Sequence, residues 1–163
     1  MSTKKIVLAL GSNMGDSVSH LSRAVSAISK FANVLELSKI YQTKPWGYLE
    51  QDDFLNAVIL AETKLEPSAL LIECKKIESE FGRDFSQFRN APRPIDIDII
   101  FYEDLEISTP ELTIPHAQWQ SRDFVITPLL DIAVSQNFIN AFGYKLTQQI
   151  LSNEKSYNPF AEF

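Results

Sequence analysis

The sequence predicts an α+β fold with a ferredoxin-like core: a mostly antiparallel sheet with helices packed on both faces. The first observation is that strand-like and helix-like segments follow one another in the order β-α-β-β-α-β, with a C-terminal extension. The second is that 163 residues, 45% of them hydrophobic and 22% charged, can bury a sizeable core. We therefore expect residues 1–163 to form a single domain.

The first half of this order comes from four segments. Residues 5–10 form a short apolar run that ends at a glycine, which predicts a buried strand. Residues 17–31 place apolar side chains three or four positions apart, as on one stripe of a helix. Residues 33–42 and 53–63 have the alternation and β-branched content of strands.

The second half begins with a helix that opens at Pro67, continues to Phe81 and ends at Gly82. Ile95 to Tyr102 then predict the last core strand. The extension adds shorter pieces: a strand at 105–107, an extended piece between Pro110 and Pro115, a helical segment at 120–134 interrupted at Pro128, and an amphipathic pattern at 138–151.

Two aspartates are unusual residues for the last predicted strand. Asp96 and Asp98 alternate with isoleucines, although Asp is depleted in strands. Side chains two apart share one face, so the two carboxylates repel unless a cation lies nearby. Mg²⁺ prefers one or two carboxylates completed by water and phosphate oxygens. The pair indicates a metal site, and the alternative is a strand whose Asp face is solvated.

Arginines gather around the same stretch. Four of the five arginines in the chain lie between positions 83 and 122: Arg83, Arg89, Arg93 and Arg122. The guanidinium fork suits phosphate oxygens, so arginines beside an Asp pair favour a polyphosphate site held with metal. The alternative for any one of them is a surface ion pair.

Charge and cysteine content limit the classes of partner and the location. A net charge of −6 disfavours nonspecific binding to nucleic acid or to an anionic membrane. Cys74 is a single cysteine, and the apolar run after Lys5 is too short for a signal peptide or a membrane span. We expect a cytoplasmic protein whose partners are small molecules.

Two further features are compatible with a flat ligand. The loop at 43–48 carries Trp46 and Tyr48 beside Pro and Gly, so it is either an aromatic platform or a loop that folds its Trp onto the core. Asn56 is polar among apolar neighbours. If it is buried, it pairs with backbone or with the hydrogen-bonding edge of a ligand.

Three motifs resemble those of the 6-hydroxymethyl-7,8-dihydropterin pyrophosphokinase family and occur in the same order along the chain. They are residues 91–98 (APRPIDID), residues 43–48 (TKPWGY) together with 53–56 (DFLN), and residues 112–116 (LTIPH). The resemblance extends from Gly11 to about Leu130. It implies transfer of pyrophosphate from ATP to the hydroxymethyl group of the pterin, with release of AMP, in folate biosynthesis.

The resemblance also implies roles for residues. Asp96 and Asp98 would hold two Mg²⁺ ions, and Asp96 is a candidate to receive the hydroxyl proton. Arg83 and Arg93 would neutralise phosphate charge, so these four are the expected catalytic residues. The expected pterin contacts are Thr43, Pro45, Trp46, Phe54, Asn56 and Phe124. The expected nucleotide contacts are Lys75, Glu78, Arg89, His116 and Arg122.

The sequence departs from the family pattern at Asn90 and Ala117, where aromatic residues are common, and at Lys75, where Gln is common. These departures leave open a degenerate relative that binds nucleotide or pterin without turnover. An Asp-dependent phosphohydrolase is a second alternative, and a ferredoxin-like RNA-binding module is disfavoured by the charge. Other enzymes of the folate pathway are possible partners.

Overall fold

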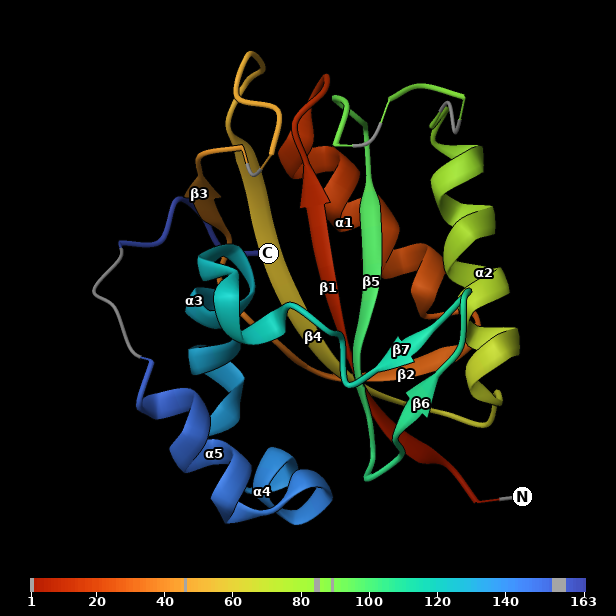
Figure 1. Cartoon of the computed structure of the whole chain (residues 1–163), viewed down its shortest axis with the longest axis vertical. Helices are drawn as coiled ribbons and strands as arrows, with labels where there is room; N and C mark the ends of the chain where they lie inside the picture. Colours follow the sequence, from red (N-terminus) through yellow and green to blue (C-terminus); the bar gives the residue numbers. More distant parts are fainter. Residues whose placement is uncertain (1, 46, 84–85, 89, 154–157) are drawn as a thin grey trace.

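The computed structural model describes residues 2–45, 47–83, 86–88, 90–153 and 158–163. Within these residues, five strands form one antiparallel sheet in the order β2-β4-β1-β5, and β3 continues the edge by pairing with β4 (Figure 1). Their bounds are β1 Lys4–Ser12, β2 Ala32–Leu37, β3 Tyr41–Thr43, β4 Phe54–Thr63 and β5 Asp96–Tyr102. This order, with helices on both faces, confirms the predicted fold.

The predicted strand at 33–42 is two strands, and a serine explains the break. Ser38 Oγ accepts a hydrogen bond from the Val58 amide at 2.9 Å and donates to the Lys39 carbonyl at 2.7 Å. Ile40 then pairs with Ala161 of the C-terminal segment. A side chain and a distant segment therefore replace the regular ladder between β2 and β3.

Two helices cover one face of the sheet, α1 (Ser17–Ile28) and α2 (Pro67–Glu80) (Figure 1). The Asp16 side chain caps α1 by accepting a hydrogen bond from the Ser19 amide at 3.2 Å. Both helices pack their apolar stripes on alternate residues of β1, β4 and β5, as the periodicity predicted.

The other face carries the extension. Its elements are β6 (Ile107–Ser108), β7 (Thr113–Ile114), the 3₁₀ turn η1 (Trp119–Ser121), α3 (Asp123–Ala133), α4 (Gln136–Phe142) and α5 (Tyr144–Leu151). The predicted interruption at Pro128 is wrong, because Pro128 lies inside α3. As the sixth residue of α3, Pro128 forgoes only its own bond to the Phe124 carbonyl, and burial of the α3 stripe outweighs that loss.

The amphipathic pattern at 138–151 is two short helices instead of one. Gly143, with φ of 90°, ends α4 in a conformation that L side chains rarely adopt, and α5 begins directly after it. Among the described helices, none alone is long and apolar enough to cross a membrane. Only α3 and α4 taken together reach that length and composition, with a bend of 109° between them.

Candidate active site

The carboxylate pair lies on the face of β5 that points away from α1 and α2. Asp96 pairs in register with Gly11 of β1, and Asp98 pairs with Ala9. The register shifts by one residue after Ile99, so that Ile100 and Phe101 both enter the core beneath α3. The strand therefore presents its two charged side chains at one end and continues as a buried apolar strand at the other.

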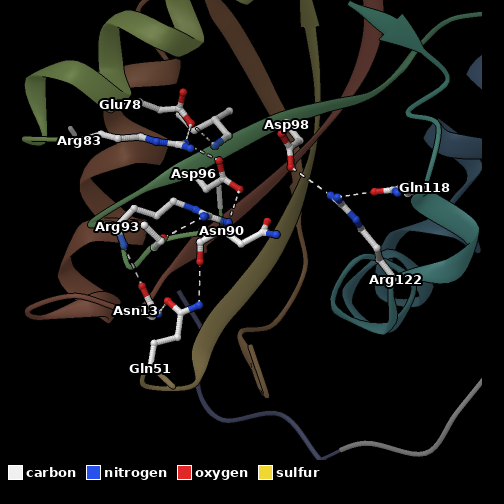
Figure 2. Close-up of polar contacts among 12 residues, drawn as sticks. Asn13, Gln51, Glu78, Arg83, Asn90, Arg93, Asp96, Asp98, Gln118 and Arg122 are labelled. Atoms are coloured by element: carbon white, nitrogen blue, oxygen red, sulfur yellow. Dashed lines mark hydrogen bonds and ion pairs between the residues drawn. The ribbon is translucent and has the colours of Figure 1, made fainter. Parts of the chain in front are cut away.

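Arg83 joins the C-terminal end of α2 to the carboxylate pair (Figure 2). Its Nη1 donates to Asp96 Oδ1 at 2.8 Å and to Glu78 Oε2 at 2.9 Å. Glu78 is 2% exposed and also accepts the Ile97 amide at 3.0 Å. The family resemblance implied a nucleotide contact for Glu78, and the structure places Glu78 behind Asp96, where it fixes Arg83 against β5.

Arg93 reaches Asp96 from the opposite side. Its Nη2 lies 3.4 Å from Asp96 Oδ2, and its Nη1 donates to the Ala91 carbonyl at 3.0 Å. The guanidinium carbon also lies 5.1 Å from the centre of the Phe54 ring, within range of a cation–π contact. Arg93 thus borders both the carboxylates and an aromatic ring.

Asp98 has a longer ion pair. Its Oδ2 lies 3.8 Å from Nη1 of Arg122, the residue before α3, and Arg122 Nη2 donates to Gln118 Oε1 at 2.7 Å (Figure 2). The Arg122 guanidinium lies 5.3 Å from the centre of the Phe124 ring. Each carboxylate therefore faces an arginine that stacks near a phenylalanine.

The pKa values of Glu78, Asp96 and Asp98 are shifted in different directions. Burial raises the pKa of Asp98 to about 7, and the negative charge of Asp96 adds to that shift. Burial and the charge of Asp96 likewise raise the pKa of Glu78 to about 7. Burial also acts to raise the pKa of Asp96, but the charges of Arg93 and Arg83 outweigh it and leave that pKa lowered. Asp96 is the ionised member of the cluster, and Asp98 lacks a full counter-charge.

A narrow cleft opens beside the pair, between β3, the C-terminal end of β1 and the start of α3. Several residues predicted to contact the pterin line it together with both aspartates: Thr43, Phe54, Asn56 and Phe124. Asn56 is 4% exposed and donates from Nδ2 to Thr43 Oγ1 at 2.6 Å. A cleft lined by a buried amide and two phenylalanine rings is suited to a flat, hydrogen-bonding ligand.

The predicted nucleotide residues occupy several places. Arg122 and His116 line a hollow that continues from Asp98 toward β7. Burial and the charge of Arg122 lower the pKa of His116 to about 4, so the ring is neutral near pH 7, and Nδ1 accepts the Gln118 amide at 3.2 Å. Lys75 lies exposed on α2, and Pro45 is buried beside β3; neither lines these hollows. Trp46 and Arg89 lie outside the described residues.

Sequence reasoning missed several residues of the site. Gly11 was interpreted only as the end of a strand, yet a side chain there would place a Cβ 3.2 Å from Asn56 Oδ1 and 3.5 Å from the Phe54 ring. Asn13 and Gln51 bridge the loops around Arg93 and received no role. Gly11 and Asn13 belong to the Gly-Ser-Asn stretch at which the family resemblance begins, and this was the signal that could have pointed to them.

The loop with Asn90 is closed by other contacts. Tyr48 and Phe88 pack edge to face with ring centres 4.9 Å apart, which joins the loop after β3 to the loop before β5. Asn90 has φ of 64°, a conformation in which Asn is several-fold enriched, and packs against Gly47. A different aromatic pair therefore joins these two loops, where the sequence lacks an aromatic residue at position 90.

The carboxylate pair fits a hard divalent cation in its donor chemistry. Each carboxylate oxygen offers two lone-pair directions, so the arginine contacts of Asp96 leave acceptor capacity, and Asp98 is the less neutralised partner. Among the described residues, no group of three or more His, Cys, Asp or Glu side chains comes close enough to hold a metal ion. Such an ion needs its remaining ligands from substrate and water.

Comparison with known proteins agrees with this chemistry. The profile of the 7,8-dihydro-6-hydroxymethylpterin-pyrophosphokinase (HPPK) family matches residues 7–134. A 2-amino-4-hydroxy-6-hydroxymethyldihydropteridine pyrophosphokinase of Aquifex aeolicus is 39% identical over 155 residues, which cover 95% of this chain and 94% of that protein. The protein of that name from Porphyromonas gingivalis (strain W83) is 41% identical, covering 78% of this chain and 90% of its own.

Longer proteins also match. The folic acid synthesis protein FOL1 of Dictyostelium discoideum is 43% identical over 91% of this chain, which spans only 22% of that protein. Among solved structures, wild-type HPPK-DHPS of Plasmodium falciparum with pteroate has a TM-score of 0.66 at 16% identity. That match covers 93% of this chain and 43% of the other, and it shows the shared fold.

Proposed function

The chain belongs to the 7,8-dihydro-6-hydroxymethylpterin-pyrophosphokinase family, and on that premise we propose how its residues carry out the reaction. The enzyme transfers pyrophosphate from ATP to the hydroxymethyl group of 6-hydroxymethyl-7,8-dihydropterin in folate biosynthesis and releases AMP. The observation that carries the residue assignment is that one face of β5 joins an aromatic cleft to a cluster of arginines.

The aromatic cleft binds the pterin. Phe54 and Phe124 lie on either side of the flat ring, and Asn56, held by Thr43, reads its polar edge. Pro45 and Trp46 complete the predicted pterin contacts. Because the cleft also contains Asp96 and Asp98, the hydroxymethyl group projects toward the carboxylates.

The arginines bind the phosphates. Arg83 and Arg93 approach Asp96 from two sides, and their donors stabilise the charge that shifts from the pyrophosphate being transferred to the departing AMP. Arg122 and His116 extend the site toward the nucleoside, Glu78 acts on the nucleotide side through Arg83, and Lys75 and Arg89 stay predicted nucleotide contacts. By its position in the family motif, Asp96 is also the candidate to receive the proton of the attacking hydroxyl.

Asp96 and Asp98 would also hold the divalent cations, and we propose that these are two Mg²⁺ ions. Bound Mg²⁺ supplies positive charge that polarises the phosphate and stabilises the entering and leaving oxygens. The carboxylates supply the negative charge that attracts it, and Asp98 gains the counter-charge that Arg122 alone supplies only at 3.8 Å.

Separation of nucleotides tests the reaction. The protein is incubated with ATP, Mg²⁺ and 6-hydroxymethyl-7,8-dihydropterin, and AMP is expected only when the pterin is present. ADP formation or ATP loss without pterin contradicts the proposal and identifies a kinase or hydrolase. Binding of both ligands without AMP identifies a binding module. Omission of Mg²⁺ is expected to abolish AMP release, and full activity in excess chelator contradicts the metal assignment.

Three wider expectations go with this function. Residues 1–163 act as one pyrophosphokinase domain, in agreement with α4 and α5 packing on the same core as α3. The enzyme acts in the cytoplasm, which cell fractionation tests. Relatives named for folate synthesis include longer chains, so an enzyme of the same pathway is a candidate partner, and co-elution with the enzyme that consumes the product tests this.

A further inference from the structure

Three loops meet at a polar contact that none of the predicted site residues explains (Figure 2). Asn13 lies in the loop after β1, Gln51 in the loop between β3 and β4, and Asn90 and Arg93 in the loop before β5. We call these four residues the loop junction. Their positions in the chain are 38 or more residues apart from one loop to the next.

Within the junction, Asn13 holds the backbone of Arg93 from two directions. The Asn13 amide donates to the Arg93 carbonyl at 3.2 Å, and Asn13 Oδ1 accepts the Arg93 amide at 3.0 Å. Asn13 is only 6% exposed, so these bonds are shielded from water. The position from which the Arg93 guanidinium reaches Asp96 is therefore set by a residue of the first loop.

The side-chain amides of Asn13 and Gln51 each donate hydrogen bonds through the nitrogen and accept one through the oxygen. Asn13 Nδ2 donates to Gln51 Oε1 at 2.8 Å and to the Asp52 carbonyl at 3.0 Å. Gln51 Nε2 donates to the Tyr48 carbonyl at 2.7 Å and to the Asn90 carbonyl at 2.8 Å. Each position needs an acceptor and a donor on one side chain, which a carboxylate or an aliphatic side chain does not supply.

We propose that Asn13 and Gln51 are positioning residues for pyrophosphate transfer, Asn13 acting through Arg93 and Gln51 by fastening the loop after β3 to the loop before β5. The inference rests on the proposed role of Arg93. Asn13 acts on the arginine that faces the shifting charge, so its loss lowers kcat. Gln51 acts on loops that flank the cleft, so its loss raises KM.

Four single variants separate the roles. Asn13→Ala is expected to lower kcat 10- to 100-fold. Asn13→Asp keeps the acceptor for the Arg93 amide but loses both donated bonds, so kcat stays within about threefold while KM rises. Gln51→Ala raises KM for the pterin at least fivefold with kcat nearly unchanged. Asn33→Ala is the matched control, because Asn33 Nδ2 donates to Glu62 Oε1 at 3.2 Å at the other end of the sheet, and it leaves both constants unchanged.

A double variant tests whether Asn13 acts through Arg93. In the Arg93→Ala background, Asn13→Ala is expected to reduce kcat by less than twofold, because the group it positions is gone. A reduction as large as in the wild-type background overturns the proposal. It is also overturned if Asn13→Ala lowers only the melting temperature, with kcat and KM unchanged.

Amide hydrogen exchange gives a measure that does not depend on turnover. Asn13→Ala is expected to speed exchange of the Arg93 amide at least tenfold, whereas Asn33→Ala does not. Unchanged exchange shows that Asn13 does not hold this backbone and overturns the proposal. If the wild-type protein releases no AMP but exchange responds as expected, the proposed function fails and the junction stands.

Discussion

Two clusters of charged side chains lie toward opposite ends of the sheet, and they differ in how their carboxylates are neutralised. At one end, Glu62 of β4 accepts bonds from Lys5 Nζ at 2.8 Å, from Asn33 and from Thr3. The hydrogen bonds from Lys5 and Asn33 lower the pKa of Glu62. At the other end, burial and Asp96 raise the pKa of Asp98 to about 7.

Exposure of the carboxylates does not account for the contrast. The Glu62 side chain is 23% exposed, and the Asp96 and Asp98 side chains are 21% and 30% exposed. The Asp pair lies among more protein atoms, shares one face of a strand and leaves Asp98 with an ion pair of 3.8 Å. A cluster whose charges are satisfied within the protein stabilises the fold, whereas one that is left unbalanced is prepared for a charged ligand.

Removing the unbalanced charge has the largest expected effect. Asp98→Asn is expected to lower AMP release at least 1000-fold, because a metal ligand is lost. At pH 7 the same change raises the free energy of unfolding by on the order of 1 kcal/mol, since the repulsion by Asp96 disappears. Thermal melting and nucleotide separation measure both quantities. Glu62→Gln is expected to leave the rate unchanged, and a comparable loss of rate there removes the distinction between the clusters.

Arg93 and Lys5 form the second pair of variants. Arg93→Ala is expected to lower kcat 100- to 1000-fold, the range for loss of one donor to a charged transition state. Its stability cost is about 1 kcal/mol or less, because Arg83 still pairs with Asp96. Lys5→Ala costs a similar small amount of stability and no rate. Losses of rate and stability that run in parallel in Arg93→Ala assign it a structural role.

Lowering the pH is expected to reduce the stability of the folded protein through His116. Its pKa is about 4 in the folded protein and 6.5 when unperturbed, so the unfolded chain takes up the proton first as pH falls. The contribution of this group to stability is complete above pH 6.5 and is lost as pH falls toward 4, by at most about 1.4 kcal/mol per pH unit. Denaturant unfolding between pH 7 and 4 measures it. Because the raised pKa values of Asp98 and Glu78 act in the opposite sense over this range, the test is the difference between variant and wild type: His116→Gln is expected to lose less stability on acidification than the wild type, and an equal pH dependence in both proteins assigns the effect to other groups.

The smallest effect is expected at Gly11. Gly11→Ala places a methyl group 3.2 Å from Asn56 Oδ1, and the strand geometry needs no other change. We expect KM for the pterin to rise two- to tenfold while KM for ATP stays constant. Steady-state kinetics with each substrate varied in turn checks this. Equal changes in both constants place the effect on the carboxylates instead.

The elements of the fold were predicted where one periodic pattern decided them. The stripes of α1 and α2 and the alternation of β4 and β5 point apolar side chains to one core, so local sequence and packing agree. Prediction was wrong at Pro128, where burial outweighed a local preference. It also missed the break before β3, because Ser38 and the C-terminal segment act over a distance that no local pattern carries.

The residues of the site also divide into those that the sequence could predict and those that it could not. Asp96 and Asp98 were detectable because carboxylates violate the pattern of a strand. Asn13 and Gln51 were not, because their amides are ordinary in polar loops and acquire meaning only from partners 38 to 80 residues away. The family resemblance indicated the pterin and nucleotide residues, and the roles of Lys75, Trp46 and Arg89 stay predictions.

Gly11 pairs in register with Asn56 on one side and with Asp96 on the other. Since neighbouring strands lie about 4.8 Å apart, the backbone of the residue proposed to bind the pterin edge and that of the carboxylate proposed to serve the transfer stand about 10 Å apart. Backbone hydrogen bonds of three strands fix this separation, and no loop motion alters it. We expect this fixed spacing to favour a substrate whose hydroxyl lies at a matching distance from its recognised edge, whether or not the loops have closed.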